Sequence, residues 1–149
     1  MARVLYFAYG ALLDQRKLRR RCLDAVSLGR ARLPDFRLAF TRYSRADKGG
    51  VADVVPEPGA EVWGALYDID DACLASLDEY EEAPRAYRRE TARVIAEDGV
   101  EREAVIYIAN KTGDFAPSRQ YLAIIVGGAR EHGLPEEYVQ GIEQVRPHS

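Results

Sequence analysis

Residues 51–67 read VADVVPEPGAEVWGALY, and this stretch indicates how the chain folds. Residues 51–55 and 61–67 are rich in apolar and β-branched side chains, which are typical of β-strands. The segment between them, Pro56-Glu57-Pro58-Gly59, has the composition of a turn. The spacing therefore predicts a β-hairpin.

Working outward, short apolar runs bounded by turn residues predict further strands. Leu33-Pro34-Asp35 is interpreted as a turn before one of them, and the polar residues 42–50 as a loop. Asp98-Gly99 between two apolar runs predicts a second hairpin. The predicted strands are residues 4–8, 36–40, 88–96 and 102–108.

Four helices are predicted between and after these strands, each from a residue that suits a helix start. Hairpins and helices are mixed without the regular strand–helix–strand alternation of a doubly wound sheet. We therefore predict an α+β fold in which helices surround a small, partly closed sheet. The predicted helices begin after Asp14, Asp70, Ser118 and Pro135 and end near Cys22, Glu82, Glu131 and Val145.

Composition narrows the class of protein. The 149 residues are 47% hydrophobic and 30% charged, which fits one globular domain spanning residues 1–149. The net charge of −3 predicts no nucleic-acid partner and no attraction to an anionic membrane. The first ten residues resemble a strand rather than a signal peptide, and no apolar run reaches the ~20 residues of a membrane helix. We therefore expect a cytoplasmic protein.

Cysteine and histidine are sparse. Cys22 and Cys73 do not form a short Cys-x-x-Cys spacing, so the sequence suggests neither a disulfide framework nor a structural zinc site. Two histidines near the C-terminus do not predict a histidine-rich metal site.

One carboxylate stands out in the segment DDACLASLDEYEE, residues 70–82. On a helix, Leu74, Leu77 and Glu81 share one face, so Glu81 occupies a position where the pattern calls for an apolar residue. Burial there would raise its pKa, as a proton shuttle near neutral pH requires. The structural alternative is a Glu81 that frays out at the helix end or pairs with a nearby arginine, Arg85, Arg88 or Arg89.

Four segments, in this order, resemble the γ-glutamylcyclotransferase family and together cover nearly the whole chain. They are YFAYGALL (6–13), GGVADVVPEPGAEVWGALY (49–67), SLDEYEEAPRAYRR (76–89) and PSRQYLAIIVGGAREHGLPEEYVQGIEQV (117–145). The resemblance implies a small, mixed, partly closed β-barrel flanked by helices. It also implies that the α-amine of a small γ-glutamyl amide attacks its own γ-carbonyl, releasing 5-oxoproline and a free amine or amino acid without cofactor or metal. Glu81 corresponds to the family's catalytic glutamate.

The resemblance also suggests substrate-binding residues. The opening loop, Tyr9-Gly10-Ala11-Leu12-Leu13, leaves a strand and approaches a helix, so its free N–H groups could hold the substrate α-carboxylate; the alternative is a plain strand-to-helix turn. Tyr107 and Tyr121 match family tyrosines. Each could position Glu81 or the substrate through its hydroxyl, or simply pack in the core with that hydroxyl satisfied.

Two departures from the family pattern bear on function. Ala11-Leu12 replaces a Ser-Asn pair, which removes side-chain hydrogen bonds to a substrate. Glu82 replaces a glycine and would be strained if that position needs a positive φ. The altered loop keeps two alternatives open: a non-catalytic ligand-binding module, or an enzyme that uses Glu81 for proton transfer on a less polar substrate.

The remaining expectations concern partners. The basic segment RKLRRR, residues 16–21, is interpreted either as a solvated helix face or as a surface that attracts an acidic substrate. A homodimer is possible, although no feature of the sequence specifies one.

Overall fold

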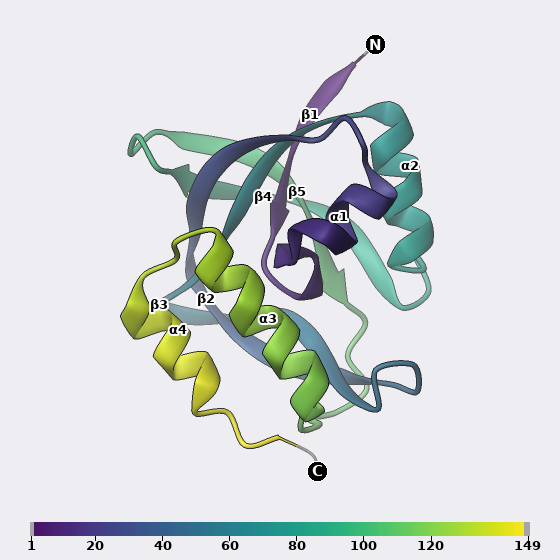
Figure 1. The fold of residues 1–149 in the computed structure, drawn as a ribbon, viewed down its shortest axis with the longest axis vertical. Coiled ribbons are helices and arrows are strands. Elements are labelled where there is room, and N and C mark those ends of the chain that lie inside the picture. The colour runs from purple at the N-terminus through teal and green to yellow at the C-terminus, as the bar shows by residue number, and fades with distance from the viewer. Residues whose placement is uncertain (1, 148–149) are drawn as a thin grey trace.

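The computed structural model describes residues 2–147. Within them, five strands close into a barrel in the order β1-β3-β2-β4-β5 (Figure 1). The pairing of β1 with β5 is parallel and the other neighbours are antiparallel, so the sheet is mixed. The predicted α+β barrel is confirmed. The strands are β1 (Arg3–Ala8), β2 (Val26–Ser44), β3 (Gly49–Asp70), β4 (Tyr87–Ala96) and β5 (Glu101–Ala109).

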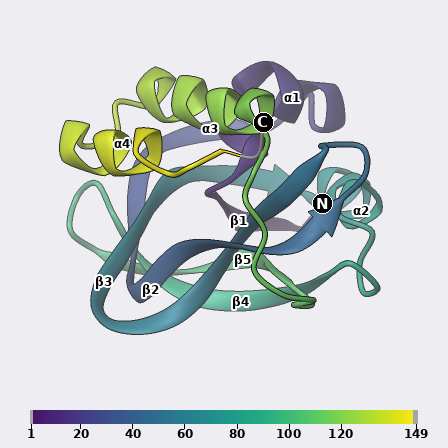
Figure 2. The ribbon, with the colours of Figure 1, turned by 90° about the horizontal axis from the view of Figure 1, so that it is seen from below.

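Helices flank the barrel. In Figures 1 and 2, α3 and α4 lie together as one layer across the barrel, and α1 lies beside α2. The predicted caps are present, because the Asp14, Asp70 and Ser118 side chains accept backbone N–H bonds at helix starts. Among residues 2–147, no helix has the length and apolar character needed to cross a membrane. The helices are η1 (Ala11–Leu13, 3₁₀), α1 (Gln15–Arg21), α2 (Asp71–Tyr80), α3 (Arg119–Glu131) and α4 (Glu136–Glu143).

The hairpin predicted within residues 51–67 is wrong. Residues 49–70 form one long strand, β3, which pairs antiparallel with β2 from Ser44↔Gly49 to Val26↔Asp68. The Pro56–Gly59 segment and the predicted turn at Leu33-Pro34-Asp35 lie opposite each other, at a register shift where both strands continue. Asp35 has φ +66 and its carboxylate accepts the Gly59 N–H at 3.0 Å. Turn residues here bend a pair of strands instead of ending them.

The structure also corrects the expectation for the cysteines. Cys22, which follows α1, and Cys73, in the first turn of α2, form a disulfide with a Cα–Cα distance of 4.9 Å. The two residues are 51 positions apart, so their spacing gave no sign of the pairing. The bond ties α1 to α2 on one side of the barrel.

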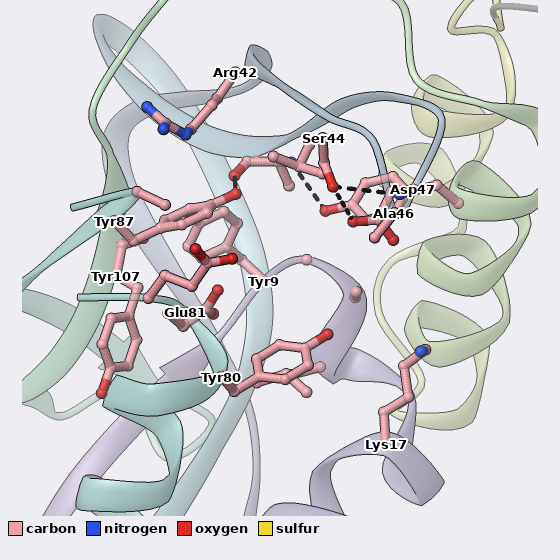
Figure 3. Close-up of a pocket in the computed structure, with 18 of the residues that line it drawn as sticks. Tyr9, Lys17, Arg42, Ser44, Ala46, Asp47, Tyr80, Glu81, Tyr87 and Tyr107 are labelled. Atoms are coloured by element: carbon pink, nitrogen blue, oxygen red, sulfur yellow. Dashed lines mark hydrogen bonds between the residues drawn. The ribbon is translucent and has the colours of Figure 1, made fainter. Parts of the chain in front are cut away.

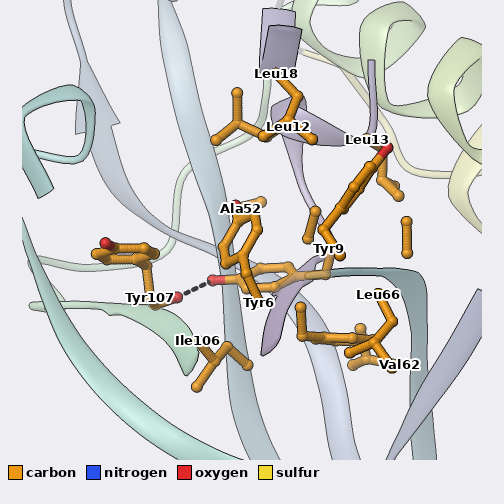
Figure 4. Packing of buried hydrophobic residues seen from close by; sticks show 14 of the residues in the cluster. Tyr6, Tyr9, Leu12, Leu13, Leu18, Ala52, Val62, Leu66, Ile106 and Tyr107 are labelled. Atoms are coloured by element: carbon orange, nitrogen blue, oxygen red, sulfur yellow. Dashed lines mark hydrogen bonds between the residues drawn. The ribbon is translucent and has the colours of Figure 1, made fainter. Parts of the chain in front are cut away.

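The core fills the barrel and extends under the helices (Figure 4). Leu13 and Leu18 are fully buried and carry η1 and α1 into this core. Gly128 of α3 permits that contact, because a Cβ there would lie 2.5 Å from the Leu13 carbonyl carbon. The close packing of α3 on η1 therefore sets the position of the opening loop.

Candidate active site

A cavity of about 610 Å³ opens at one end of the barrel. Its wall combines residues of η1, the turn between β2 and β3, and the C-terminal end of α2 (Figure 3). The volume is in the range of ~300–1,000 Å³ typical of small-molecule sites. Its ionisable residues other than tyrosine are Lys17, Arg42, Arg45, Asp47, Glu81, Glu82 and Arg85.

Glu81 lies at the end of α2, as the helical spacing predicted. It is the C-cap residue, and its N–H donates to the Leu77 carbonyl at 2.9 Å. The Glu81 side chain is half-buried and lines the cavity, and no hydrogen bond to its carboxyl group is present among residues 2–147. Burial, together with the negative charge of Asp47, raises the pKa of Glu81 to about 8. Glu81 can therefore take up and release a proton near neutral pH.

The structural alternative for Glu81 was an ion pair with a nearby arginine, and the structure does not show that pairing. All three candidate arginines pair with other carboxylates. Glu81 therefore lies in the cavity without a cationic partner from this group. The observed pairs are Arg85 with Glu82, Arg88 with Glu90 and Arg89 with Asp78.

Glu82 stands where the family pattern has a glycine, and its backbone has a positive φ. Its φ is +54, a left-handed value that L-residues with a Cβ adopt at a cost of ~1–2 kcal/mol. The backbone thereby reverses directly after Glu81, and the Glu82 carboxylate turns to Arg85. The second carboxylate thus lies beside Glu81 in sequence but is neutralised by its own partner.

The opening loop forms a further part of the wall. Tyr9, Gly10, Ala11 and Leu12 line the cavity, whereas Leu13 does not, because it is fully buried. Within the described chain, the N–H groups of Ala11 and Leu12 donate to no protein acceptor. Gly10 lies so close to the neighbouring strand that a Cβ would be 3.0 Å from the Ala52 Cβ. The loop thus presents unpaired backbone donors at the cavity.

The predicted site tyrosines line the cavity with their rings, and their hydroxyls have protein partners. The Tyr107 hydroxyl donates to Asp78 Oδ1 at 2.6 Å, on the far side from Glu81 in Figure 3. The Tyr121 hydroxyl accepts the Ala52 N–H at 2.9 Å, and the Tyr9 hydroxyl donates to the Tyr107 carbonyl at 2.6 Å. The structure thus matches the alternative of packed rings with satisfied hydroxyls, although the Tyr121 hydroxyl keeps a proton to donate.

Other cavity residues were not singled out individually from the sequence. Asp47 is the one acidic residue of the polar segment 42–50 predicted as a loop, and its sequence context gives no link to Glu81. Lys17 belongs to the basic segment 16–21, which was noted only as a whole. The hydroxyls of Tyr6 and Tyr80 have no protein partner among residues 2–147. Burial raises the pKa of Tyr80 to about 12, so the Tyr80 hydroxyl stays a neutral donor at physiological pH. Their positions depend on contacts between distant segments.

Comparison with known proteins places this cavity in a family. The AIG2-like family matches residues 61–142. The gamma-glutamylcyclotransferase of Homo sapiens is 35% identical over 148 residues, and that of Mus musculus 34%; each match covers 96% of this chain and 79% of the relative. A solved structure titled gamma-glutamyl cyclotransferase superposes with a TM-score of 0.94 at 33% identity, covering 99% of this chain and 90% of its own.

The similarity of sequence and fold between this chain and these relatives agrees with the four family-like segments found in the sequence. The same regions that carry those motifs, β1 with η1 and α2 with Glu81, form the cavity. The chain belongs to the γ-glutamylcyclotransferase family of enzymes.

Proposed function

We propose that this chain cyclises a small γ-glutamyl amide to 5-oxoproline and releases the amine or amino acid that formed the amide. The observation that carries the proposal is Glu81, a carboxyl group with a pKa of about 8 and no protein hydrogen-bond partner among residues 2–147, inside a ligand-sized cavity. Membership of the family supports the same reaction.

The proposed reaction moves two protons from the attacking nitrogen to the leaving nitrogen. Ionised Glu81 accepts a proton from the substrate α-ammonium, and the neutral amine attacks the γ-carbonyl carbon to close a five-membered ring. The bond from that carbon to the amide nitrogen then breaks, and the leaving nitrogen takes the proton back from Glu81. The regenerated carboxylate accepts the second proton from the ring nitrogen and passes it to the released amine, which departs as an ammonium, so one acid/base residue suffices. By holding the folded substrate, the cavity can bring amine and carbonyl near contact.

The other predicted site residues keep proposed roles in substrate binding. In this proposal the unpaired N–H groups of Ala11 and Leu12 donate hydrogen bonds to the substrate α-carboxylate. Gly10 keeps the backbone close to the bound group, and Tyr9, Tyr107 and Tyr121 supply aromatic walls. Leu13 acts indirectly, by anchoring η1 in the core. No side chain at position 11 or 12 adds a hydrogen bond, so recognition here depends on the backbone.

The test is product analysis. Purified protein incubated with a panel of γ-glutamyl amides should release 5-oxoproline, detected by mass spectrometry. Glu81→Gln should lose activity by about 10²-fold or more, since the proton carrier is removed. Thr91→Ser, a change outside the cavity, is the control for differences in expression and purification and should keep full activity. Binding of γ-glutamyl compounds without 5-oxoproline would support the ligand-binding alternative, and full activity of Glu81→Gln would contradict the assigned role.

Location and assembly also stay predictions. A cytoplasmic location was favoured by sequence, and the Cys22–Cys73 disulfide is an observation against it, because cytosolic thiols are usually kept reduced. Cell fractionation combined with thiol labelling decides between a reduced cytosolic protein and an oxidised one elsewhere. A homodimer is tested by sedimentation of the purified chain.

A further inference from the structure

We propose that His132 is a positioning residue for the opening loop, acting through a hydrogen bond from its Nε2–H to the Leu13 carbonyl. This bond orients the backbone N–H of Leu12, one of the two donors proposed to hold the substrate α-carboxylate. The inference rests on the proposed function. It assigns a role in substrate binding to a side chain outside the cavity wall, on the C-cap residue of α3.

The C-terminal end of α3 meets the peptide group between Leu13 and Asp14 at two points. His132 Nε2 lies 3.1 Å from the Leu13 carbonyl oxygen. Four residues earlier, Gly128 lies so close that a Cβ would be 2.5 Å from the Leu13 carbonyl carbon and 2.7 Å from the Asp14 nitrogen. Residues four apart share a helix face, so one face of α3 holds this peptide by close packing at Gly128 and by a hydrogen bond at His132.

The His132 ring has to donate in this bond, because a carbonyl oxygen only accepts. Burial lowers the pKa of His132 below its ordinary value, so the ring is neutral at physiological pH and its single N–H is on Nε2. The Tyr67 hydroxyl, also 3.1 Å from Nε2, is then a second acceptor of the same N–H. Leu13 is fully buried, and no other donor reaches its carbonyl among residues 2–147. Loss of the His132 donor would therefore leave a buried carbonyl unpaired.

A chain of peptide groups leads from His132 to the cavity. The peptide that accepts the His132 bond carries the Asp14 N–H, which donates to the Ala11 carbonyl at 3.1 Å. The peptide of the Ala11 carbonyl carries the Leu12 N–H, which donates to no protein acceptor within the described chain. The C=O and N–H of a trans peptide point in opposite directions, so fixing the Ala11 carbonyl fixes the direction of the Leu12 N–H. Hydrogen bonds in a chain also polarise one another, which strengthens the donor at its end.

The effect of His132 should be confined to recognition of the α-carboxylate. Glu81 takes no part in the chain of peptide groups, because its N–H donates within α2. Removing the His132 donor should therefore weaken the anion site and leave proton transfer by Glu81 in place. A substrate without an α-carboxylate separates this role from general support of the structure, which would affect every substrate alike.

The experiment compares γ-glutamyl-alanine with 4-aminobutanoyl-alanine, which keeps the attacking amine and the reacting carbonyl and lacks only the α-carboxylate. His132→Met should lower kcat/KM for γ-glutamyl-alanine by about 5- to 100-fold, the range for leaving a buried polar group unpaired, and mainly by raising KM. For the analogue, kcat/KM should change by less than about 2-fold, and its inhibition constant replaces kcat/KM if the wild type does not cyclise it. His132→Gln places an amide N–H near the position of Nε2 and should restore kcat/KM for γ-glutamyl-alanine to within about 3-fold of the wild type.

Tyr67→Phe is the matched control, since it removes the other partner of Nε2 and keeps the bond to Leu13. It should change neither value, and a loss equal to that of His132→Met would assign the effect to Tyr67 and overturn the inference. Thermal unfolding of each variant identifies a folding defect. If His132→Met does not fold, His132→Asn, whose shorter side chain withdraws the donor, repeats the comparison.

The remaining outcomes separate this inference from the proposed function. Equal loss on both compounds would mean that His132 only supports the structure, and no loss on γ-glutamyl-alanine would mean that the bond to Leu13 does not act on binding. Either result overturns the inference while 5-oxoproline is still formed. Absence of 5-oxoproline from γ-glutamyl-alanine and the wider panel with the wild type would overturn the proposed function, and this inference with it.

Discussion

Asp47 and Glu81 present two carboxyl groups to one cavity, although they lie on different parts of the fold. Asp47 belongs to the turn between β2 and β3 and accepts a hydrogen bond from Ser44 Oγ at 2.9 Å, whereas Glu81 ends α2. Burial is the larger cause of the raised pKa of Glu81, and the negative charge of Asp47 is the second. The acid/base behaviour of the site thus depends on a residue 34 positions away in sequence (81 minus 47).

Asp47→Asn should therefore move the pH dependence of activity. Removing the neighbouring charge makes ionised Glu81 more favourable, so its pKa falls below about 8 but stays above the ordinary value because burial persists. The acid limb of the kcat/KM profile should shift to lower pH. Glu82→Gln is the control, since Glu82 pairs with Arg85 and is not a cause of the shift. An unshifted profile for Asp47→Asn would show that Asp47 does not act on Glu81.

Glu81 should also make stability depend on pH. Its folded pKa of about 8 exceeds the ordinary 4.5, so the folded state binds the proton more tightly than the unfolded state does. The resulting contribution of Glu81 to the free energy of unfolding is fully present below pH 4.5. It is lost as pH rises toward 8, at a slope of at most about 1.4 kcal/mol per pH unit. Urea unfolding at several pH values should show Glu81→Gln gaining stability relative to the wild type across this window. A constant difference would contradict the raised pKa.

Gly128 and Gly127 provide a matched pair for testing how α3 positions the opening loop. A Cβ on Gly128 would lie 2.5 Å from the Leu13 carbonyl carbon and 2.7 Å from the Asp14 nitrogen, so backbone must move. Gly128→Ala should destabilise the protein by about 1–3 kcal/mol and lower kcat/KM by displacing η1. Gly127→Ala meets no atom within 4 Å and should stabilise α3 by about 0.5–1 kcal/mol without changing kinetics. Chemical unfolding and steady-state rates test both, and equal behaviour of the two variants would refute the contact.

The Cys22–Cys73 bond closes a loop with a sequence separation of 51. Constraining the unfolded chain in this way is typically worth about 2–4 kcal/mol. A Cys22→Ser/Cys73→Ser double variant should lose that much free energy of unfolding, measured in denaturant, and a reducing agent should lower the wild type to the same value. The double variant itself should not respond to the reductant. A wild type that is indifferent to reduction would show that the bond is not formed in solution.

Several local features could be predicted from sequence because their causes are local. Asp14, Asp70 and Ser118 cap helices through bonds to residues two or three positions away, so the pattern of neighbouring side chains identifies them. The spacing of Leu74, Leu77 and Glu81 on one helix turned Glu81 inward for the same reason. The prediction of a turn failed at Pro56–Gly59. Turn residues there accompany a bend in a strand that stays paired, because β2 pairs with β3 on both sides of the bend and lies outside the local segment.

The sequence by itself determined which residues start helices and place a carboxylate on an apolar helix face, since these depend on neighbours within about one helical turn. Tertiary structure decided the rest of the site. It closed the barrel by pairing β1 with β5, paired Cys22 with Cys73, and brought Asp47 and Lys17 to the cavity of Glu81. It also paired the arginines near Glu81 with other carboxylates. The pKa of a carboxyl group reflects all charges and solvent around it, and those surroundings exist only once distant segments have packed together.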